Sequence, residues 1–378
     1  MAVWAQESRS DPGLVNRLSS EEDAVYMRRA IQLAERGRGQ VAPNPLVGAV
    51  IVREGRLVGE GWHARFGGPH AEVVALDAAG DEARGATLYV SLEPCAHHGK
   101  TGPCTQAILA HGIERVVYAA PDPDPKAAGG GEMLSRSGVQ VTSGIEADAA
   151  KSINGRFFRA HSRSAPDRPW TELKLAISLD GGVADRDGHS TWITGDESRA
   201  EVHRLRSGHD AIAVGIATAL ADDPILTVRG EIEPRIPPAR VVFDRAARLP
   251  LTSRLVQSAR EIPVSVVCAP DAPAASRRDL EGEGVRVVEA TDITAALAAL
   301  RSGGIESLFC EGGARIASVL LGADLVDRLT LFIAPILLGP DAIGPFREIP
   351  STPLAEAHRW RLVSSRTFGP DTVICVEP

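Results

Sequence analysis

The chain has 378 residues, with 41 Lys and Arg against 49 Asp and Glu, which gives a formal net charge of −8. This length predicts about two domains, and the acidic balance argues against a broad nucleic-acid-binding face while leaving room for a small phosphorylated substrate. Five cysteines are too few for a disulfide framework, so we expect reduced thiols and a cytoplasmic location.

The N-terminal segment carries no targeting pattern. Residues 1–18 contain no apolar core of the kind found in signal peptides, and no stretch approaches the roughly 20 apolar residues of a membrane span. We therefore expect residues 1–18 to be a poorly ordered tail and the protein to have no membrane association. A helix is expected to begin near Ser19, where Glu22 completes a capping-box pattern, and to end at Gly37.

Helices and strands alternate in the rest of the first half, which favours an α/β sandwich. A short turn at residues 53–55 predicts a β-hairpin. The expected elements are strands 46–52 and 56–61, helix 71–79, strand 87–91, helix 105–111, strand 115–119, a loop over 121–131, a shorter helix and strand reaching Gly144, and a helix over 147–158.

A polar segment with two prolines, residues 161–169 (HSRSAPDRP), has the composition of a linker. It predicts one domain over residues 19–165 and a second over 166–378. The second half again reads as α/β, with no internal repeat of the first. Its expected elements are strand 171–178, helix 197–207, and strands 210–215, 240–244, 263–268, 285–289, 307–310, 329–334 and 371–376.

His70, Glu72, Cys95 and Cys104 form a pattern typical of a catalytic zinc site. Three histidine and cysteine ligands would leave a fourth position for water, as catalytic zinc requires. Glu72 would then be free to move protons, the role of the glutamate in zinc deaminases with the H-x-E and P-C-x-x-C signature. Cys95 follows a predicted strand, and a helix N-terminus near it would lower the pKa of its thiol.

The interval between the two cysteines departs from that signature, because eight residues separate Cys95 from Cys104 instead of two. His97 and His98 lie in the interval and could compete as metal ligands, or they could face substrate or solvent. His63 is expected to be structural. An H-x-E alone would be weak support for a metal site, but Pro-Cys after a strand and a second cysteine in the next loop favour the zinc interpretation.

Three segments of the first domain resemble, nearly word for word, the deaminase half of the bifunctional riboflavin-biosynthesis deaminase/reductase family. They are PNPLVGAVIV (43–52), GWHARFGGPHAE (61–72) and LEPCAHHGKTGPC (92–104). The long interval between the cysteines is a feature of that family and weighs against a cytidine or transfer-RNA adenosine deaminase. The resemblance covers about residues 21–378 and implies a cytidine-deaminase-like three-layer α/β fold for the first domain.

The resemblance also implies a substrate, 2,5-diamino-6-ribosylamino-4(3H)-pyrimidinone 5′-phosphate, which would lose its 2-amino group by hydrolysis. It implies zinc as the metal and Glu72 as the proton shuttle. The implied zinc ligands are His70, Cys95 and Cys104. Asn44, in the Pro-Asn-Pro loop, is expected to contact the pyrimidine, and His98 and Lys100 are candidates to face the phosphate.

The second domain resembles the reductase half of the same family. The matching segments are LKLAISLDGGVA (173–184), GHSTWITG (188–195), HDAIAVGIATALADDPILTVR (209–229), LFCEGGARIASVLL (308–321) and LFIAPILLG (331–339). They imply a dihydrofolate-reductase-like α/β fold and NADPH as the cofactor. The implied reaction reduces the ribosyl C1′ in its open-chain form to a ribityl group, giving 5-amino-6-ribitylaminouracil 5′-phosphate.

Matching residue by residue gives two sets of expected contacts. Those expected to touch NADPH are Ala176, Trp192, Thr218, Asp222, Gly313, Ala314, Arg315, Ile316, Ala317, Ser318 and Val319, with Arg245 for its 2′-phosphate. Those expected to touch substrate are Ser190, Arg206, Leu226, Arg229 and Glu311, with Lys174 near the ribose hydroxyls. A Glu-Gly-Gly turn before a helix suits a pyrophosphate, and the guanidinium forks of Arg206 and Arg229 suit a phosphate.

The sequence shows no convincing proton donor for the reduction, so positioning is expected to carry much of that step. The family resemblance implies a homo-oligomer, either dimer or tetramer, with a small-molecule substrate and neither nucleic acid nor membrane as partner. Two alternatives stay open. The reductase domain could act on another pteridine- or purine-like compound, or the chain could be a metabolite-binding regulator, which would be expected to lack a metal ligand or Glu72.

Overall fold

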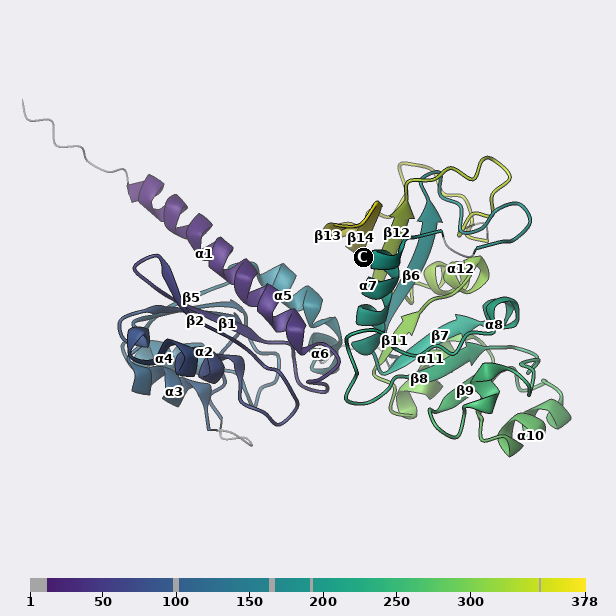
Figure 1. Ribbon diagram of the computed structural model, residues 1–378, viewed down its shortest axis with the longest axis horizontal. Coiled ribbons are helices and arrows are strands. Elements are labelled where there is room, and N and C mark those ends of the chain that lie inside the picture. Colours follow the sequence, from purple (N-terminus) through teal and green to yellow (C-terminus); the bar gives the residue numbers. More distant parts are fainter. Residues whose placement is uncertain (1–11, 98–101, 163–166, 191–192, 347) are drawn as a thin grey trace, which may run out of the picture. The chain divides into compact units, whose positions relative to one another are not determined.

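The structure is a computed structural model that describes residues 12–97, 102–162, 167–190, 193–346 and 348–378, with side chains from residue 21 onward. The chain divides into two units, Met1–His161 and Ser162–Pro378 (Figure 1). Each unit has its own sheet. Within the described ranges, no helix combines the length and the apolar character needed to cross a membrane.

The first unit is built on a five-stranded sheet in the order β2-β1-β3-β4-β5. Its strands are β1 (Gly48–Arg53), β2 (Arg56–Trp62), β3 (Thr87–Leu92), β4 (Arg115–Ala120) and β5 (Gln140–Ser143). The β1–β2 hairpin is antiparallel, and β1 also runs antiparallel to β3. Strands β3, β4 and β5 are parallel, so their carboxyl ends meet at one edge of the sheet.

Helices cover both faces of this sheet. They are α1 (Pro12–Ala34), α2 (Ala71–Ala79), α3 (Cys104–His111), α4 (Gly130–Arg136), α5 (Ala147–Ile153) and α6 (Gly155–Ala160), with short 3-10 turns η1 (Glu35–Gly37) and η2 (Gly80–Ala83). Alternate residues of β1 face opposite sides: Ile51 packs with α2, α3 and α4, whereas Val50 packs with α1 and α5. Figure 1 shows the same grouping of helices. The first unit is therefore the three-layer α/β fold that the resemblance implied.

Two boundaries in the first unit differ from the predictions. Helix α1 begins at Pro12, so the expected tail over 1–18 and the expected start near Ser19 were wrong for residues 12–18; residues 1–11 lie outside the described residues. Proline fits the first helical position because a backbone N–H there would have no partner within the helix, so the N–H that proline lacks is not missed. The helix expected over 147–158 is interrupted at Asn154, whose side chain hydrogen-bonds the backbone of Leu46.

The second unit contains a nine-stranded sheet in the order β10-β9-β8-β7-β11-β6-β12-β14-β13. The strands are β6 (Trp170–Ser178), β7 (Ala211–Gly215), β8 (Ala239–Phe243), β9 (Val264–Cys268), β10 (Arg286–Glu289), β11 (Ser307–Cys310), β12 (Arg328–Ala334), β13 (Arg361–Phe368) and β14 (Asp371–Glu377). All pairs are parallel except those that involve β13 and β14. Strand β13, which the sequence patterns did not predict, forms an edge of this sheet.

Two hydrophobic clusters lie on opposite faces of the second sheet. The helices are α7 (Asp196–Ser207), α8 (Ile216–Asp222), α9 (Arg254–Gln257), α10 (Ala274–Gly282), α11 (Ile293–Ser302) and α12 (Ala314–Gly322). Residues of α11 and α12, such as Leu297 and Leu320, pack with one face, and residues of α9 and α10, such as Leu255 and Leu280, pack with the other. This layered, mostly parallel arrangement agrees with the expected dihydrofolate-reductase-like α/β fold.

The strand order contains a switch point at the carboxyl ends of β7 and β11, which are parallel neighbours. The chain leaves β7 through α8 toward β8, on one side. It leaves β11 through α12 toward β12, on the other side. Ligands of open α/β sheets bind in the crevice that such diverging connections create. The fold therefore places a ligand site of the second unit beside the N-termini of α8 and α12.

Candidate active sites

The three predicted zinc ligands come together in the first unit. His70 is the N-cap residue of α2, Cys95 follows β3, and Cys104 is the first residue of α3. His70 Nδ1 lies 3.2 Å from Cys104 Sγ and 3.6 Å from Cys95 Sγ. The ligand atoms of all three residues lie within 4.8 Å of one another. Two helix N-termini thus converge on one point, but the second begins at Cys104 and not at Cys95, where the sequence placed it, because Cys95 lies in a non-helical segment after β3.

These separations fit a single tetrahedral ion. Ligand atoms about 2.0–2.3 Å from a zinc ion are about 3.5 Å from one another, close to the distances between His70 and the two cysteines. The hydrogen bond with the Cys104 thiol lowers the pKa of Cys95 to about 4, against the opposing effect of burial. The same hydrogen bond raises the pKa of Cys104. Cys95 is therefore the cysteine that forms a thiolate more readily, and Cys104 would lose its proton when a metal binds.

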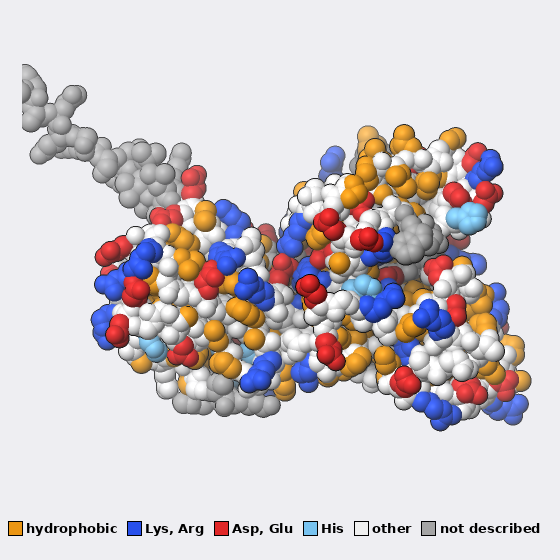
Figure 2. Space-filling model, viewed as in Figure 1, with side chains coloured by type: hydrophobic (Ala, Val, Ile, Leu, Met, Phe, Trp, Pro, Cys, Tyr) orange, Lys and Arg blue, Asp and Glu red, His pale blue; other side chains and the backbone are white. Residues whose placement is uncertain are grey.

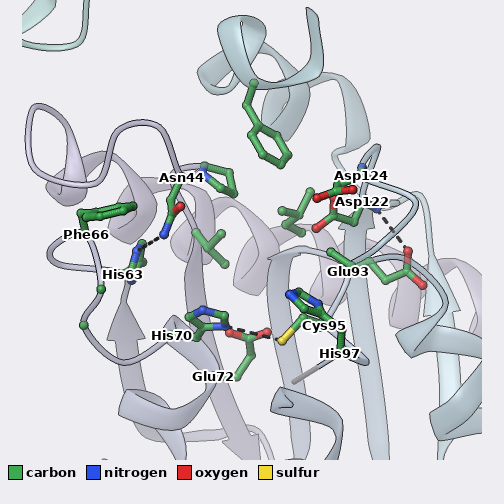
Figure 3. A pocket seen from close by; sticks show the side chains of 17 residues that line it. Asn44, His63, Phe66, His70, Glu72, Glu93, Cys95, His97, Asp122 and Asp124 are labelled. Atoms are coloured by element: carbon green, nitrogen blue, oxygen red, sulfur yellow. Dashed lines mark hydrogen bonds between the residues drawn. The ribbon is translucent and has the colours of Figure 1, made fainter. Parts of the chain in front are cut away.

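Glu72 lies in the first turn of α2 and faces the cavity beside His70 (Figure 3). Its side chain is buried, with 3% of the residue exposed. Burial raises the pKa of its carboxyl group. A carboxyl group held next to a metal site but outside the ligand cluster suits proton transfer, which works best when the pKa lies near the operating pH.

The cavity in front of the metal cluster has a volume of about 310 Å³. Its lining residues include Asn44, His63, Phe66, His70, Glu72, Glu93, Cys95, His97, Asp122, Asp124 and Phe157. His97 lines the cavity but does not belong to the metal cluster. Asp122 and Asp124 form an acidic wall (Figure 3), and burial raises the pKa of Asp122 to about 6. The predictions for His98 and Lys100 fall outside the described residues.

Glu93 links the acidic wall to the segment after β3 that contains Cys95. Its carboxylate accepts hydrogen bonds from the backbone N–H groups of Asp122 at 3.1 Å, Gly129 at 3.1 Å and Gly131 at 3.0 Å. The sequence interpretation missed this role. A signal was available, because Glu93 and Asp122 both follow the carboxyl ends of neighbouring parallel strands, where loop residues meet.

Asn44, which was expected to contact the pyrimidine, lines the cavity. Its amide contacts His63, a residue expected to be structural. Asn44 Nδ2 lies 3.2 Å from His63 Nε2, and His63 Nδ1 lies 3.0 Å from the carbonyl oxygen of Pro69. Burial lowers the pKa of His63, so its imidazole is neutral near pH 7. The loop itself is pinned by Asn154, which bonds both the N–H and the C=O of Leu46.

A charged cluster lies in the second unit near the carboxyl end of β11, formed by Lys174, Arg206 and Glu311. The guanidinium of Arg206 binds the Glu311 carboxylate through two hydrogen bonds and donates a third, of 2.9 Å, to the carbonyl of Thr227. The ammonium of Lys174 lies 5.3 Å from the centre of the Phe332 ring. Burial lowers the pKa of Lys174, although Glu311 opposes that effect.

This geometry refines the expected role of Arg206. Its guanidinium nitrogens already bond Glu311 and the Thr227 carbonyl, so they are not free to bind a phosphate. The loop that carries Leu226 and Arg229 is held against α7, because Arg206 binds the Thr227 carbonyl and the N–H of Arg229 donates to His203 Nδ1 at 3.1 Å. Leu226 is buried with a positive φ of 56°, and the Arg229 side chain is exposed.

Several residues expected to bind NADPH border the switch point. Gly313 is the N-cap of α12, and a carbon added to it would lie 3.2 Å from Thr218 Oγ1, in the first turn of α8. Arg245 follows β8 at the same edge of the sheet. Ala176 lies near the carboxyl end of β6. Asp222 ends α8, away from this crevice.

The remaining residues that were expected to contact NADPH or substrate differ in their exposure. Within the run from Gly313 to Val319, residues Ile316, Ala317 and Ser318 are buried, so the accessible surface comes from the first residues of α12 and from Val319. Arg315 is exposed and lies 3.9 Å from Glu348. Ser190 is exposed, and Trp192 lies outside the described residues.

Comparison with known proteins adds to this geometry. A family model described as the RibD C-terminal domain matches residues 169–374, and one described as the cytidine and deoxycytidylate deaminase zinc-binding region matches residues 20–120. The chain is 40% identical over 367 residues to the riboflavin biosynthesis protein RibD of Escherichia coli (strain K12), covering 93% of this chain and 98% of that protein. The RibD protein of Aquifex aeolicus (strain VF5) is 38% identical over 356 residues, covering 94% and 98%.

Solved structures give the same result. Acinetobacter baumannii RibD (form 1) is 38% identical with a TM-score of 0.75, covering 95% of this chain and 99% of that one. The diaminohydroxyphosphoribosylaminopyrimidine deaminase/5-amino-6-(5-phosphoribosylamino)uracil reductase of Thermotoga maritima is 33% identical with a TM-score of 0.75 and the same two coverages, 95% and 99%. The similarity therefore extends over both units.

Proposed function

The chain belongs to the RibD family of bifunctional riboflavin-biosynthesis enzymes, and from this premise we propose how its residues divide the two reactions. The enzyme is a zinc-dependent deaminase joined to an NADPH-dependent reductase. We take 2,5-diamino-6-ribosylamino-4(3H)-pyrimidinone 5′-phosphate as the first substrate. The domain boundary falls within residues 161–169.

For the deamination, His70, Cys95 and Cys104 would hold zinc. When bound, zinc supplies Lewis acidity that makes water a competent nucleophile near pH 7. Glu72 takes the proton from the attacking water and delivers it to the departing amine. Its buried position supports both steps, because burial raises the pKa of the carboxyl group, which makes it a better proton acceptor than an exposed glutamate.

The two walls of the deaminase cavity favour one orientation of the substrate. Asn44 contacts the pyrimidine on one side. Asp122 and Asp124 on another side suit hydroxyl or amino groups, which can donate hydrogen bonds to carboxylates, and they would repel a phosphate. The phosphate therefore points away from the acidic wall. Charges of both signs are interspersed on the face seen in Figure 2, which suits a small substrate better than a polyanion.

For the reduction, Thr218, Gly313 and Arg245 border the crevice that would hold NADPH. When bound, NADPH supplies the hydride that reduces the ribosyl C1′. Lys174 supplies the proton donor that the sequence did not reveal, because its ammonium is buried beside Glu311 and its pKa is lowered. Arg206 and Glu311 position Lys174 and the substrate loop, and Arg229 remains exposed to receive the phosphate.

Thiolate ligands must stay reduced to bind metal, so we place the enzyme in the cytoplasm. A homo-oligomer is also proposed. Strand β13 forms an edge of the second sheet, and its Leu362 is 58% exposed. Edge strands with exposed apolar side chains readily pair with another copy.

The observation that carries the proposed deaminase chemistry is the ligand cluster with Glu72 beside it in one cavity. The test uses purified protein, the diaminopyrimidine phosphate and NADPH. Glu72→Gln should lower ammonia release about 10³-fold, with zinc content unchanged and NADPH oxidation intact when deaminated substrate is supplied. Glu114→Gln serves as the matched control, because Glu114 is exposed and does not line the cavity.

Retained ammonia release in Glu72→Gln would refute the role of Glu72. If the wild-type protein neither released ammonia nor oxidised NADPH with this substrate, the substrate assignment would be wrong.

A further inference from the structure

Three polar groups form a short chain along one wall of the deaminase cavity: the Pro69 carbonyl, the His63 ring and the Asn44 amide. Figure 3 shows the contact between His63 and Asn44. His63 directly follows β2 and is 3% exposed. Its backbone N–H donates to the carbonyl of Val47 at 2.9 Å. The ring is therefore fixed both by its backbone and by its surroundings.

The Pro69 carbonyl decides which ring nitrogen carries the proton. A carbonyl oxygen can only accept, so His63 Nδ1, 3.0 Å away, must be the donor. A neutral imidazole has one donor and one acceptor, which leaves Nε2 as the acceptor. Asn44 Nδ2, 3.2 Å from Nε2, must then donate to it.

This direction of hydrogen bonding settles the orientation of the Asn44 amide. An asparagine amide rotated by half a turn has nearly the same shape but exchanges its oxygen and its NH₂ group. A rotated amide would bring its oxygen against the lone pair of His63 Nε2, which is repulsive. The amide oxygen is therefore the group left for a ligand in the cavity.

We propose that His63 is a positioning residue that, through the tautomer fixed by Pro69, holds the Asn44 oxygen toward the substrate, so that the deaminase selects a pyrimidine presenting an N–H group at that position. The proposal rests on the proposed function, in which Asn44 contacts the pyrimidine. A site built to hydrogen-bond one polar group discriminates strongly against a compound that lacks it. The diaminopyrimidinone offers amino and ring N–H donors.

A double-mutant cycle with the full-length enzyme tests this relay. Asn44→Ala and His63→Ala should each lower kcat/KM for ammonia release about tenfold, mainly through KM. If His63 acts through Asn44, the double variant should fall no more than about twofold below Asn44→Ala alone. His63→Gln should keep kcat/KM within about threefold of the wild type, because its amide also has one donor and one acceptor.

The measurements distinguish the positioning of Asn44 by His63 from a general structural role of His63. The His63 and His70 rings lie 5.6 Å apart edge to face, so zinc content is measured for each variant. His111→Ala is the matched control, because His111 Nδ1 also pairs with a backbone carbonyl, that of Ala107 at 2.8 Å, and His111 does not line the cavity. Zinc content in every variant and the activity of His111→Ala should match the wild type.

The proposal would be overturned if the two losses in kcat/KM multiplied in the double variant. It would also be overturned if His63→Ala lost zinc, or if a zinc-loaded His63→Gln had a kcat/KM as low as that of His63→Ala. These outcomes leave wild-type ammonia release in place. A wild-type enzyme that released no ammonia would instead overturn the proposed function.

Discussion

Lys174 supplies the net positive charge of the reductase cluster, because Arg206 and Glu311 neutralise each other in a two-point ion pair. Lys174 is also the only lysine between residue 162 and the C-terminus. Burial lowers its pKa, so it gives up a proton more readily than the free side chain, whose pKa is about 10.4. That property suits a proton donor.

Replacing Lys174 tests this role. Lys174→Gln should lower the rate of NADPH oxidation with the deaminated substrate about 100-fold, while ammonia release stays unchanged. The wild-type rate should fall as the pH rises through the lowered pKa, because the donor is then deprotonated, and this alkaline limb should be absent from the variant. Lys151→Gln is the control. An unchanged rate in Lys174→Gln would show that the proton comes from elsewhere.

Residues whose chemistry shows in the local sequence were predictable, and residues that act through distant contacts were not. His70, Cys95 and Cys104 were predicted as metal ligands from a motif, and the structure brings the three side chains together. Glu93 was missed, because its partners lie 29 to 38 residues farther along the chain and become neighbours only when β3 and β4 pair. Lys174 was expected near the ribose hydroxyls, but a role as proton donor was not predicted, because its environment depends on the whole second sheet.

At the level of elements, the start of α4, which follows the loop that carries the acidic wall, packs closely against the segment that contains Cys95. A side-chain carbon added at Gly130 would lie 1.7 Å from the carbonyl oxygen of Pro94. No rotation of a side chain relieves that overlap, because the oxygen belongs to the backbone. The acidic wall of the cavity and the metal ligand Cys95 therefore hold each other in place.

Gly130→Ala should separate these two segments. We expect a loss of about 3 kcal/mol in the free energy of unfolding of the first unit, together with weaker zinc retention and slower ammonia release. Gly102→Ala is the matched control, since nothing lies within 4 Å of an added carbon there. Thermal unfolding and zinc titration provide the measurement. Equal stability of the two variants would contradict the close approach.

A buried ion pair ties α1 to the sheet. Asp23 accepts two hydrogen bonds from Arg115, of 2.8 and 2.7 Å, and one of 2.9 Å from Tyr89. Burial alone would raise the pKa of Asp23, but these hydrogen bonds outweigh it and lower the pKa. Because the folded pKa is lower than the unfolded one, the stabilisation is present above pH about 4 and is lost as the pH falls through the folded pKa.

Asp23→Asn should therefore destabilise the first unit in a pH-dependent way. At pH 7 we expect a loss of about 2 kcal/mol in the free energy of unfolding. The difference from the wild type should shrink as the pH falls from about 5 toward 2. Urea unfolding at several pH values checks this, with exposed Asp77→Asn as control. A constant difference at all pH values would rule out the carboxylate as its source.

Most elements were predictable because strong apolar periodicity marks them. The strand expected over residues 87–91 spans Thr87–Leu92, and the helix expected over 71–79 spans Ala71–Ala79. Strand β13 was missed because its residues are mostly exposed or half-buried, so no alternation marks it. It exists through pairing with β14, a tertiary contact that a local pattern does not record. The start of α1 was missed because the capping pattern at Ser19 lies inside a longer helix.

For the whole molecule, the two units have separate cores, and each candidate site is built from residues of one unit. In the proposed mechanism, neither chemical step uses a side chain from the other unit. The deaminated intermediate can therefore be made by one molecule and reduced by another.

Mixing two inactivated variants tests this independence. Glu72→Gln retains the reductase site, and Lys174→Gln retains the deaminase site, so each alone should form little reduced product from the starting substrate. Together they should restore it, after a lag that shortens as protein concentration rises. Product formation is followed by chromatography. Failure of the mixture, with both half-reactions intact, would show that the intermediate does not pass through solution.

Asn154 and α6 complete the deaminase cavity late in the order of synthesis. Asn154 bonds the backbone of Leu46, 108 residues earlier, and Phe157 lines the cavity. A nascent chain that has emerged only as far as β5 already contains all three metal ligands and Glu72, yet the Asn44 loop has nothing to close against. During translation, when domains fold as units from the N-terminal end, metal capture can thus precede substrate competence. A truncation after β5 would give a protein that binds zinc and lacks a finished pocket.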